Sequence, residues 1–114
     1  MDTYSEDFMR KYADQLQWHF ISIGNRLTEQ FIREMSDYVD WTNISTWKMM
    51  TEEFMKEMSD KINWHMVSRW QKLSWEFIHE FHNKINWMML SVNEHINKDV
   101  WKKCKENNYI GDEY

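Results

Sequence analysis

The fold is decided by the stretch Phe54-Met-Lys-Glu-Met-Ser-Asp-Lys-Ile-Asn-Trp64, because its pattern of residue types returns along the chain. One unit earlier it reads Phe31-Ile-Arg-Glu-Met-Ser-Asp-Tyr-Val-Asp-Trp41, and one unit later it reads Phe77-Ile-His-Glu-Phe-His-Asn-Lys-Ile-Asn-Trp87. A looser copy starts at Phe8, and a degenerate unit starts near Val100. The phenylalanines lie 23 residues apart, and a fixed period of this size predicts an array of one repeated supersecondary unit.

Each unit carries the start signal of a helix. The side-chain oxygen of Ser, Thr or Asn accepts from the free N–H groups of a first helical turn. An apolar residue precedes each such position and another follows four residues later, which is the hydrophobic staple. We therefore expect the first helix of each unit to begin after Ser5, Thr28, Thr51, Ser74 and Asn97.

A second start signal lies twelve residues further on, directly before each repeated tryptophan. The capping residues are Asp40, Asn63 and Asn86, with Gln17 as the weak member of the set. Each unit is then two short helices of about nine residues, joined by turns of about two or three, and such helices depend on packing. Strand-like alternation and proline are absent. The sequence predicts an all-α fold, an α-solenoid-like or compact helical array of about nine short helices.

The composition indicates a single folded domain over residues 1–114, with units starting near Phe8, Phe31, Phe54, Phe77 and Val100. A hydrophobic content of 42% with eight Trp and ten Met excludes disorder. No apolar run is long enough for a membrane span, and the N-terminal sequence lacks a signal-peptide layout. A single cysteine, Cys104, suits a reducing compartment. We expect a cytoplasmic protein without membrane contact.

The charge is unevenly distributed. Residues 1–57 hold six Lys or Arg and eleven Asp or Glu, whereas residues 58–114 hold eight of each. Nucleic-acid binding depends on clustered cations, and the acidic first half disfavours it. The single basic run is Lys102-Lys103-Cys104-Lys105, which suits a solvated helix face.

A serine recurs at the same position of the second helix in successive units. These serines are candidate nucleophiles. A nucleophile needs a positioned base, and no base recurs beside these serines. A small residue that permits close helix approach, with its hydroxyl bonded to the preceding turn, accounts for them better. We therefore expect no enzyme activity from Ser22, Ser45, Ser68 and Ser91.

Repeated carboxylates and neighbouring histidines are the other candidates for chemistry. Glu34, Glu57 and Glu80 share one repeat position, where solvated surface charge is the simplest interpretation. His79 and His82 lie three residues apart on one helix, and Glu76 could join them. A zinc site needs three or four convergent ligands, so solvated histidines are expected, with no metal and no cofactor.

The stretch from Gln71 to Trp87 resembles a 23-residue repeat found in proteins of bacteriophages and giant viruses. The pattern there is roughly Q-x-L-S-E-x-F-I-x-E-F-x-x-K-V-x-W-x-x-I-S, and nearly the whole chain follows it, ending loosely at Asn97–Lys105. The resemblance implies a helical building block of viral origin. It implies no activity, since the function of such repeats is mostly unknown.

Apolar residues that depart from this pattern are the candidates for a partner surface. Trp75 stands where the pattern has glutamate, and Met49 stands where a polar residue is usual. For Trp47 and Trp70, filling of gaps between repeats is favoured over exposure, whereas a surface role is favoured for Trp75. The candidate partner-binding residues are Trp47, Trp70 and Trp75, and, as a second group, His65, Met66, Met88 and Met89.

These observations lead to a functional hypothesis. The chain is expected to be a non-catalytic protein-binding module of phage or viral origin. Its partner would be a host or phage protein, for example a host-defence nuclease such as a CRISPR nuclease that it inhibits. Acidity suits this role because an acidic protein can occupy a cationic nucleic-acid channel. Two alternatives stay open, a nucleic-acid-binding helical repeat and a self-assembling structural repeat that forms homo-oligomers.

Overall fold

The computed structural model describes residues 4–24 and 26–111, and the regular structure in these ranges is entirely helical. The all-α class and the number of short helices are confirmed. One 3-10 turn, η1 (Ala13–Gln15), accompanies nine α-helices: α1 (Glu6–Lys11), α2 (Trp18–Gly24), α3 (Glu29–Glu34), α4 (Trp41–Trp47), α5 (Glu52–Glu57), α6 (Trp64–Trp70), α7 (Trp75–Glu80), α8 (Trp87–Ser91) and α9 (Lys98–Glu106).

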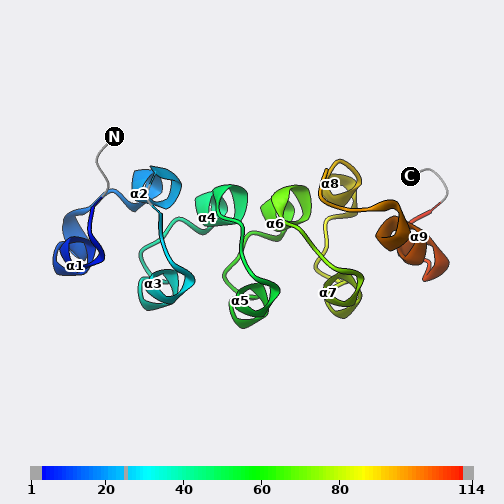
Figure 1. Ribbon diagram of the computed structural model, residues 1–114, viewed down its shortest axis with the longest axis horizontal. Helices are drawn as coiled ribbons and strands as arrows, with labels where there is room; N and C mark the ends of the chain where they lie inside the picture. Colours follow the sequence, from blue (N-terminus) through cyan, green and yellow to red (C-terminus); the bar gives the residue numbers. More distant parts are fainter. Residues whose placement is uncertain (1–3, 25, 112–114) are drawn as a thin grey trace.

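The helices form two parallel rows (Figure 1). The first helices of the units, α1, α3, α5 and α7, make one row, and the second helices, α2, α4, α6 and α8, make the other; we call these the first-helix row and the second-helix row. The array measures 51 × 25 × 17 Å. The closest backbone packing joins successive members of the second-helix row, and α7 packs on α9 at the C-terminal end.

The predicted helix caps are present. Each first-helix cap accepts a hydrogen bond from the backbone N–H three residues later, as Thr51 does from Phe54 at 3.2 Å. In the second-helix row, Asn63 accepts from the N–H of Met66 at 3.1 Å. The same arrangement recurs at Ser5, Thr28, Ser74, Asn97, Asp40 and Asn86.

The predicted helix lengths are wrong. Except for α9 and the five-residue α8, the α-helices have six or seven residues, and the linkers are longer than two or three. Between α3 and α4, the N–H groups of Tyr38 and Val39 both bond to the carbonyl of Met35, at 2.9 and 3.0 Å. Such turns keep the spacing of a helix without its regular backbone, so the apolar pattern overestimates helix length.

The core is a column of repeated aromatic stacks. The indole of Trp41 stacks on Phe54 at 6.3 Å between ring centroids, and Trp64 stacks on Phe77 of the following unit at 5.9 Å. The N–H of each of these indoles donates to the carbonyl five residues earlier, as Trp41 does to Ser36 at 2.9 Å. The residues of the repeat motif are therefore scaffold.

The repeated serines join neighbouring units. The hydroxyl of Ser22 donates to the carbonyl of Trp18 at 2.7 Å, which is the predicted bond to the preceding turn. It also accepts from the N–H of Asp40, the cap of the next second helix, at 3.0 Å. Ser45 and Ser68 accept in the same way from the caps of α6 and α8. These side chains are used for structure, because each satisfies a buried backbone group.

A second cross-link, which we call the glutamate clamp, joins the first helices. The carboxylate of Glu29 accepts from the N–H of Thr51 at 2.7 Å and from its hydroxyl at 2.8 Å. Glu52 accepts from the same two groups of Ser74, at 2.6 and 2.8 Å. Each clamp places a carboxylate at the start of the next helix, where the helix dipole favours negative charge.

The repeated Glu34, Glu57 and Glu80 are exposed, as predicted for surface charge, but they are also paired, which was not predicted. Each pairs with a cation of the preceding unit. The pairs are Arg10–Glu34 at 2.8 Å, Arg33–Glu57 at 2.6 Å and Lys56–Glu80 at 3.1 Å. Hydrogen bonds from the arginines lower the pKa of Glu34 and Glu57 below the usual value. The ladder was not visible in the sequence because its partners lie a full unit apart.

Acidification should therefore weaken the array. Because the folded pKa of Glu34 and Glu57 is lowered, the unfolded chain binds protons first as the pH falls. Their stabilisation is complete above the ordinary glutamate pKa of about 4.3 and is lost as the pH falls through the lowered folded pKa. Urea unfolding at several pH values measures this. The Arg10→Met, Arg33→Met double variant should show a shallower loss, and an unchanged slope would contradict the assignment.

Candidate partner-binding surface

Trp47 and Trp70 are exposed, so the favoured prediction that they fill gaps between repeats is wrong. Their relative exposures are 66% and 41%. In α4 the inward positions are occupied by Ile44 and Ser45, which are both buried. The last residue of this helix, Trp47, therefore lies on its solvent-exposed side. Trp70 occupies the same position in α6, and the guanidinium of Arg69 lies over its ring at 3.9 Å. The two tryptophans thus mark equivalent points on adjacent helices.

Trp75 is half-buried, and part of its side chain stays accessible. Its ring stacks on His79 at 5.1 Å and on Tyr109 at 6.0 Å. It packs against the core at the C-terminal end of the array. An indole stands here in place of a clamp glutamate, and it covers apolar surface next to Tyr109.

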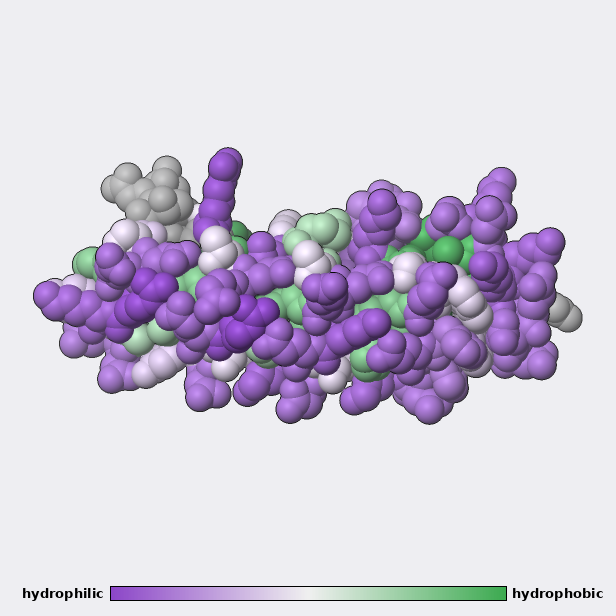
Figure 2. All heavy atoms as spheres, turned by 60° about the horizontal axis from the view of Figure 1, so that its bottom comes forward, coloured by the Kyte–Doolittle hydropathy of each residue, from purple (hydrophilic) through white to green (hydrophobic). Residues whose placement is uncertain are grey.

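Exposed apolar side chains lie at or just after the ends of the second helices. A hollow of about 570 Å³ is lined by Ile23, Trp47 and Met49, among others. We call these three residues together with Trp70 the tryptophan edge. The opposite side of the molecule, which carries the first-helix row, is mostly hydrophilic, with hydrophobic surface in narrow bands and in one patch towards the C-terminal end (Figure 2).

The second predicted group lies on α6 and α8 and is only partly accessible. His65 and Met88 are exposed, whereas Met66 and Met89 are half-buried. Nδ1 of His65 lies 3.1 Å from Nδ2 of Asn86. The structure places this group on the second-helix row too, but not in the hollow beside Trp47.

Two exposed residues of the first unit were missed by the sequence reasoning. Phe20 and Ile23 of α2 are both exposed, and Ile23 belongs to the tryptophan edge. Phe20 shares its repeat position with Asn43 and Met66, a polar and a half-buried residue. This difference in residue type could have indicated that Phe20 is exposed. It was concealed because the first unit follows the repeat pattern only loosely.

Charge separates the two rows. None of the helices α2, α4, α6 and α8 contains Asp or Glu, whereas α1, α3, α5, α7 and α9 all do. Three cations lie beside the tryptophan edge: Arg26 and Lys48 line the hollow, and Arg69 lies over Trp70. The apolar edge therefore has a positive surrounding on a chain with a net charge of −5.

The C-terminal end is closed by an aromatic cluster. Asn108 adopts a φ of 61°, a left-handed conformation that asparagine tolerates, and the chain turns back. The ring of Tyr109 then stacks on His82 at 4.5 Å and on Trp87 at 5.5 Å. Its hydroxyl lies 2.5 Å from Nδ1 of His79. The two histidines predicted to be solvated take part in this closure.

The described residues offer little for chemistry. Within residues 4–24 and 26–111, no three His, Cys, Asp or Glu side chains are grouped so that they could hold a metal ion. Burial of Cys104 raises the pKa of its thiol to about 11, so this thiol stays protonated and is a poor nucleophile. In the same ranges, no helix has the length and apolar character that a membrane span requires.

No protein-family model, curated protein or solved structure matches this chain. The geometry itself defines the class, an all-helical repeat protein built from 23-residue helix pairs. The resemblance to the repeats of phage and giant-virus proteins stays a prediction from the sequence.

Proposed function

We propose that this chain is a non-catalytic protein-binding module that contacts its partner through the tryptophan edge. One observation carries the proposal. Apart from Tyr4, Phe8 and Tyr38, the exposed large hydrophobic side chains of the described chain all belong to second helices or the linkers after them. They are Phe20, Ile23, Trp47, Met49, Trp70, Met88 and Val92.

The residue types at this surface suit binding. Trp and Arg are enriched among the residues that contribute most to protein interfaces, and Met adapts to irregular partner surfaces. Trp47 and Trp70 stand on the packed helices α4 and α6, and the hydroxyl of Ser45 in α4 accepts a hydrogen bond from the N–H of Asn63, the cap of α6. A rigid scaffold of this kind lowers the entropy cost of ordering side chains on binding.

The charges favour an acidic partner surface. Lys48 lines the hollow beside Trp47, and Arg69 covers Trp70. The second helices contribute no carboxylate that would repel an acidic partner. Complementary charge of this kind raises the association rate and selects the partner. The proposed contact is therefore an apolar segment that carries Asp or Glu.

The source of the partner follows from the resemblance to viral repeats. We propose a host protein in the cytoplasm, and a defence nuclease such as a CRISPR nuclease is the candidate of greatest interest. In bacteria that carry such a system, expression of the protein should restore plating of a targeted phage. Expression of a Trp47→Ala, Trp70→Ala variant should not restore it, and equal plating with both proteins would contradict the use of this edge.

Direct binding is tested by affinity capture with the Trp47→Ala, Trp70→Ala double variant. Loss of two central aromatic contacts should weaken partner binding by about tenfold or more. The matched control is Met88→Ala, Val92→Ala, which removes exposed apolar residues of the same row outside the edge. Both variants should melt within about 3 °C of the parent, because surface changes seldom alter stability. Undiminished capture by the tryptophan variant would refute the proposal.

Nucleic-acid binding is the weaker alternative. The basic run on α9 is small, and Lys102 pairs with Glu106 at 3.9 Å. Three cations beside the tryptophan edge are few for a phosphate-binding surface on a chain of net negative charge. A gel shift at about 50 mM salt decides this, since phosphate contacts are strongest at low salt.

Self-assembly by stacking the ends of two copies is disfavoured by charge. Inside the array, a cation of one unit meets a glutamate of the next, as in Arg10–Glu34. In the last unit, Lys102 occupies the repeat position of Arg10. In the first unit, Lys11 occupies the repeat position of Glu34. Head-to-tail stacking in the repeat register would place these two lysines together, and like charges in contact are repulsive.

A further inference from the structure

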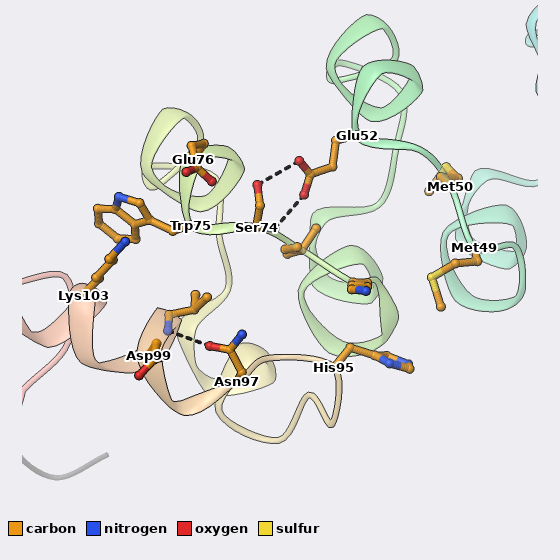
Figure 3. Close-up of a pocket in the computed structure, with 13 residues that line it drawn as sticks. Met49, Met50, Glu52, Ser74, Trp75, Glu76, His95, Asn97, Asp99 and Lys103 are labelled. Carbon is orange, nitrogen blue, oxygen red and sulfur yellow. Dashed lines mark hydrogen bonds between the residues drawn. The ribbon is translucent and has the colours of Figure 1, made fainter.

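A cavity of about 640 Å³ lies between the starts of α5, α7 and α9, where the chain departs from its own repeat (Figure 3). Its apolar wall is large. Trp75 lies on one side, and the remaining apolar lining consists of Met49, Met50, Leu73 and Val100. A concave site with an apolar wall and a few polar groups is the usual form of a binding pocket.

The repeat shows which group is missing from this cavity. In two preceding units a glutamate clamp holds the next cap, and Glu52 holds Ser74 within the wall of the cavity itself (Figure 3). In the following unit the position of the clamp glutamate is occupied by Trp75, whose side chain cannot accept a hydrogen bond. The helix cap that corresponds to Thr51 and Ser74 in that unit is Asn97. Among the described residues, no acceptor is bonded to the backbone N–H of Asn97.

The position of the missing carboxylate belongs to a cavity whose wall carries both cations and carboxylates. Asn97 lines the cavity, and its side chain is occupied in capping α9 through the N–H of Val100 at 2.9 Å. Lys72, Lys103 and His95 also line the cavity. The lining includes the carboxylates of Glu52, Glu76 and Asp99 as well, and that of Glu52 is bonded to Ser74.

We infer that this cavity binds a carboxylate side chain of the partner protein, flanked by apolar residues. The carboxylate takes the place of the missing clamp glutamate at Asn97, and the flanking residues pack on Trp75, Leu73 and Val100. The inference deepens the proposed function and rests on it for the source of the carboxylate. The cavity is larger than a single carboxylate group requires. The ligand therefore includes apolar residues next to the carboxylate, which fill the remaining space.

The test uses a defined probe, the capped tripeptide Leu-Glu-Leu, and its matched control Leu-Gln-Leu. The peptides are titrated into the isotope-labelled full chain, and the amide signal of Asn97 and the indole signal of Trp75 are followed. The glutamate peptide should shift both signals saturably at millimolar concentration. The glutamine peptide should bind at least about fivefold more weakly, because a carboxylate makes stronger hydrogen bonds than an amide. Equal binding of both peptides, or no shift up to about 10 mM, overturns the inference.

A substitution then supplies the missing carboxylate from within the chain. In Trp75→Glu the new side chain should clamp Asn97 as Glu52 clamps Ser74, and peptide binding should be lost. Trp75→Phe keeps an aromatic wall without a carboxylate and should still bind the glutamate peptide. Unaltered peptide binding by Trp75→Glu would also overturn the inference. If Trp75→Glu fails to fold, Lys72→Glu with Lys103→Glu replaces it and should abolish the same shifts.

The outcome is separable from that of the proposed function. The Trp47→Ala, Trp70→Ala variant leaves the cavity lining intact, so its peptide titration should match that of the parent. Loss of partner capture with retained peptide binding supports both proposals. Partner capture without any peptide-induced shift leaves the protein-binding role standing and removes only the carboxylate site.

Discussion

Phe54→Ala should cost about 3–5 kcal/mol of unfolding free energy, the range for truncating a buried phenylalanine. The ring is 1% exposed. It lies under the indole of Trp41 at 6.3 Å, and the guanidinium of Arg33 lies 5.5 Å from its centroid. Its loss opens a cavity in the middle of the array and removes one aromatic stack. Small domains are stable by about 5–15 kcal/mol, so much of the stability would disappear.

The repeat supplies the matched control for this experiment. Phe8 has the same repeat position but is 40% exposed, and its ring lies against Tyr4 and Tyr12, at 4.9 and 4.8 Å between centroids. Phe8→Ala should therefore cost only about 1 kcal/mol. Urea unfolding followed by tryptophan fluorescence and by circular dichroism compares the two variants. An equal loss in both would show that the aromatic column does not stabilise the array as described.

Gln71→Leu should cost about 2–4 kcal/mol although it keeps the volume and raises the apolarity of the site. The side chain is 1% exposed. Its oxygen accepts from the N–H of Met50 at 2.9 Å. Its nitrogen donates to the carbonyls of Ser45 and Lys48, at 2.9 and 2.7 Å. Leucine would leave these three backbone groups, one in α4 and two in the α4–α5 linker, without their partner.

Hydrogen exchange gives the local readout for this variant. The amide of Met50 should exchange faster in Gln71→Leu by about two orders of magnitude, in keeping with the lost hydrogen bond. Lys72→Ala changes the exposed neighbour and should leave both stability and exchange unaltered. A stable Gln71→Leu variant with a protected Met50 amide would mean that this side chain does not hold the linker.

The same device recurs one unit later, with a different residue. Nδ2 of Asn93 donates to the carbonyls of Ser68 and Gln71, both at 2.8 Å, and Asn93 is buried. Neither Gln71 nor Asn93 was singled out as structural from the sequence. A polar residue in a linker ordinarily indicates exposure, and only the approach of two units makes it a buried partner.

The sequence alone determined the local structure of this protein. The 23-residue period, the eight confirmed helix caps and the apolar spacing predicted two short helices per unit, and the structure has them. These signals act over a few residues, within a turn of helix, so they can be read from one stretch. Helix lengths were overestimated for the same local reason, since the turns retain helical hydrogen bonds.

The tertiary structure decided everything that joins one unit to the next. The serine cross-links, the glutamate clamps and the Arg–Glu ladder connect residues about 18 to 24 positions apart, as in Asp40 with Ser22 or Arg33 with Glu57. Stacking also decided that Trp47 and Trp70 face solvent while Trp75 covers the end of the array. Burial is a property of the whole array, because a side chain is covered only by the neighbour that folding places above it.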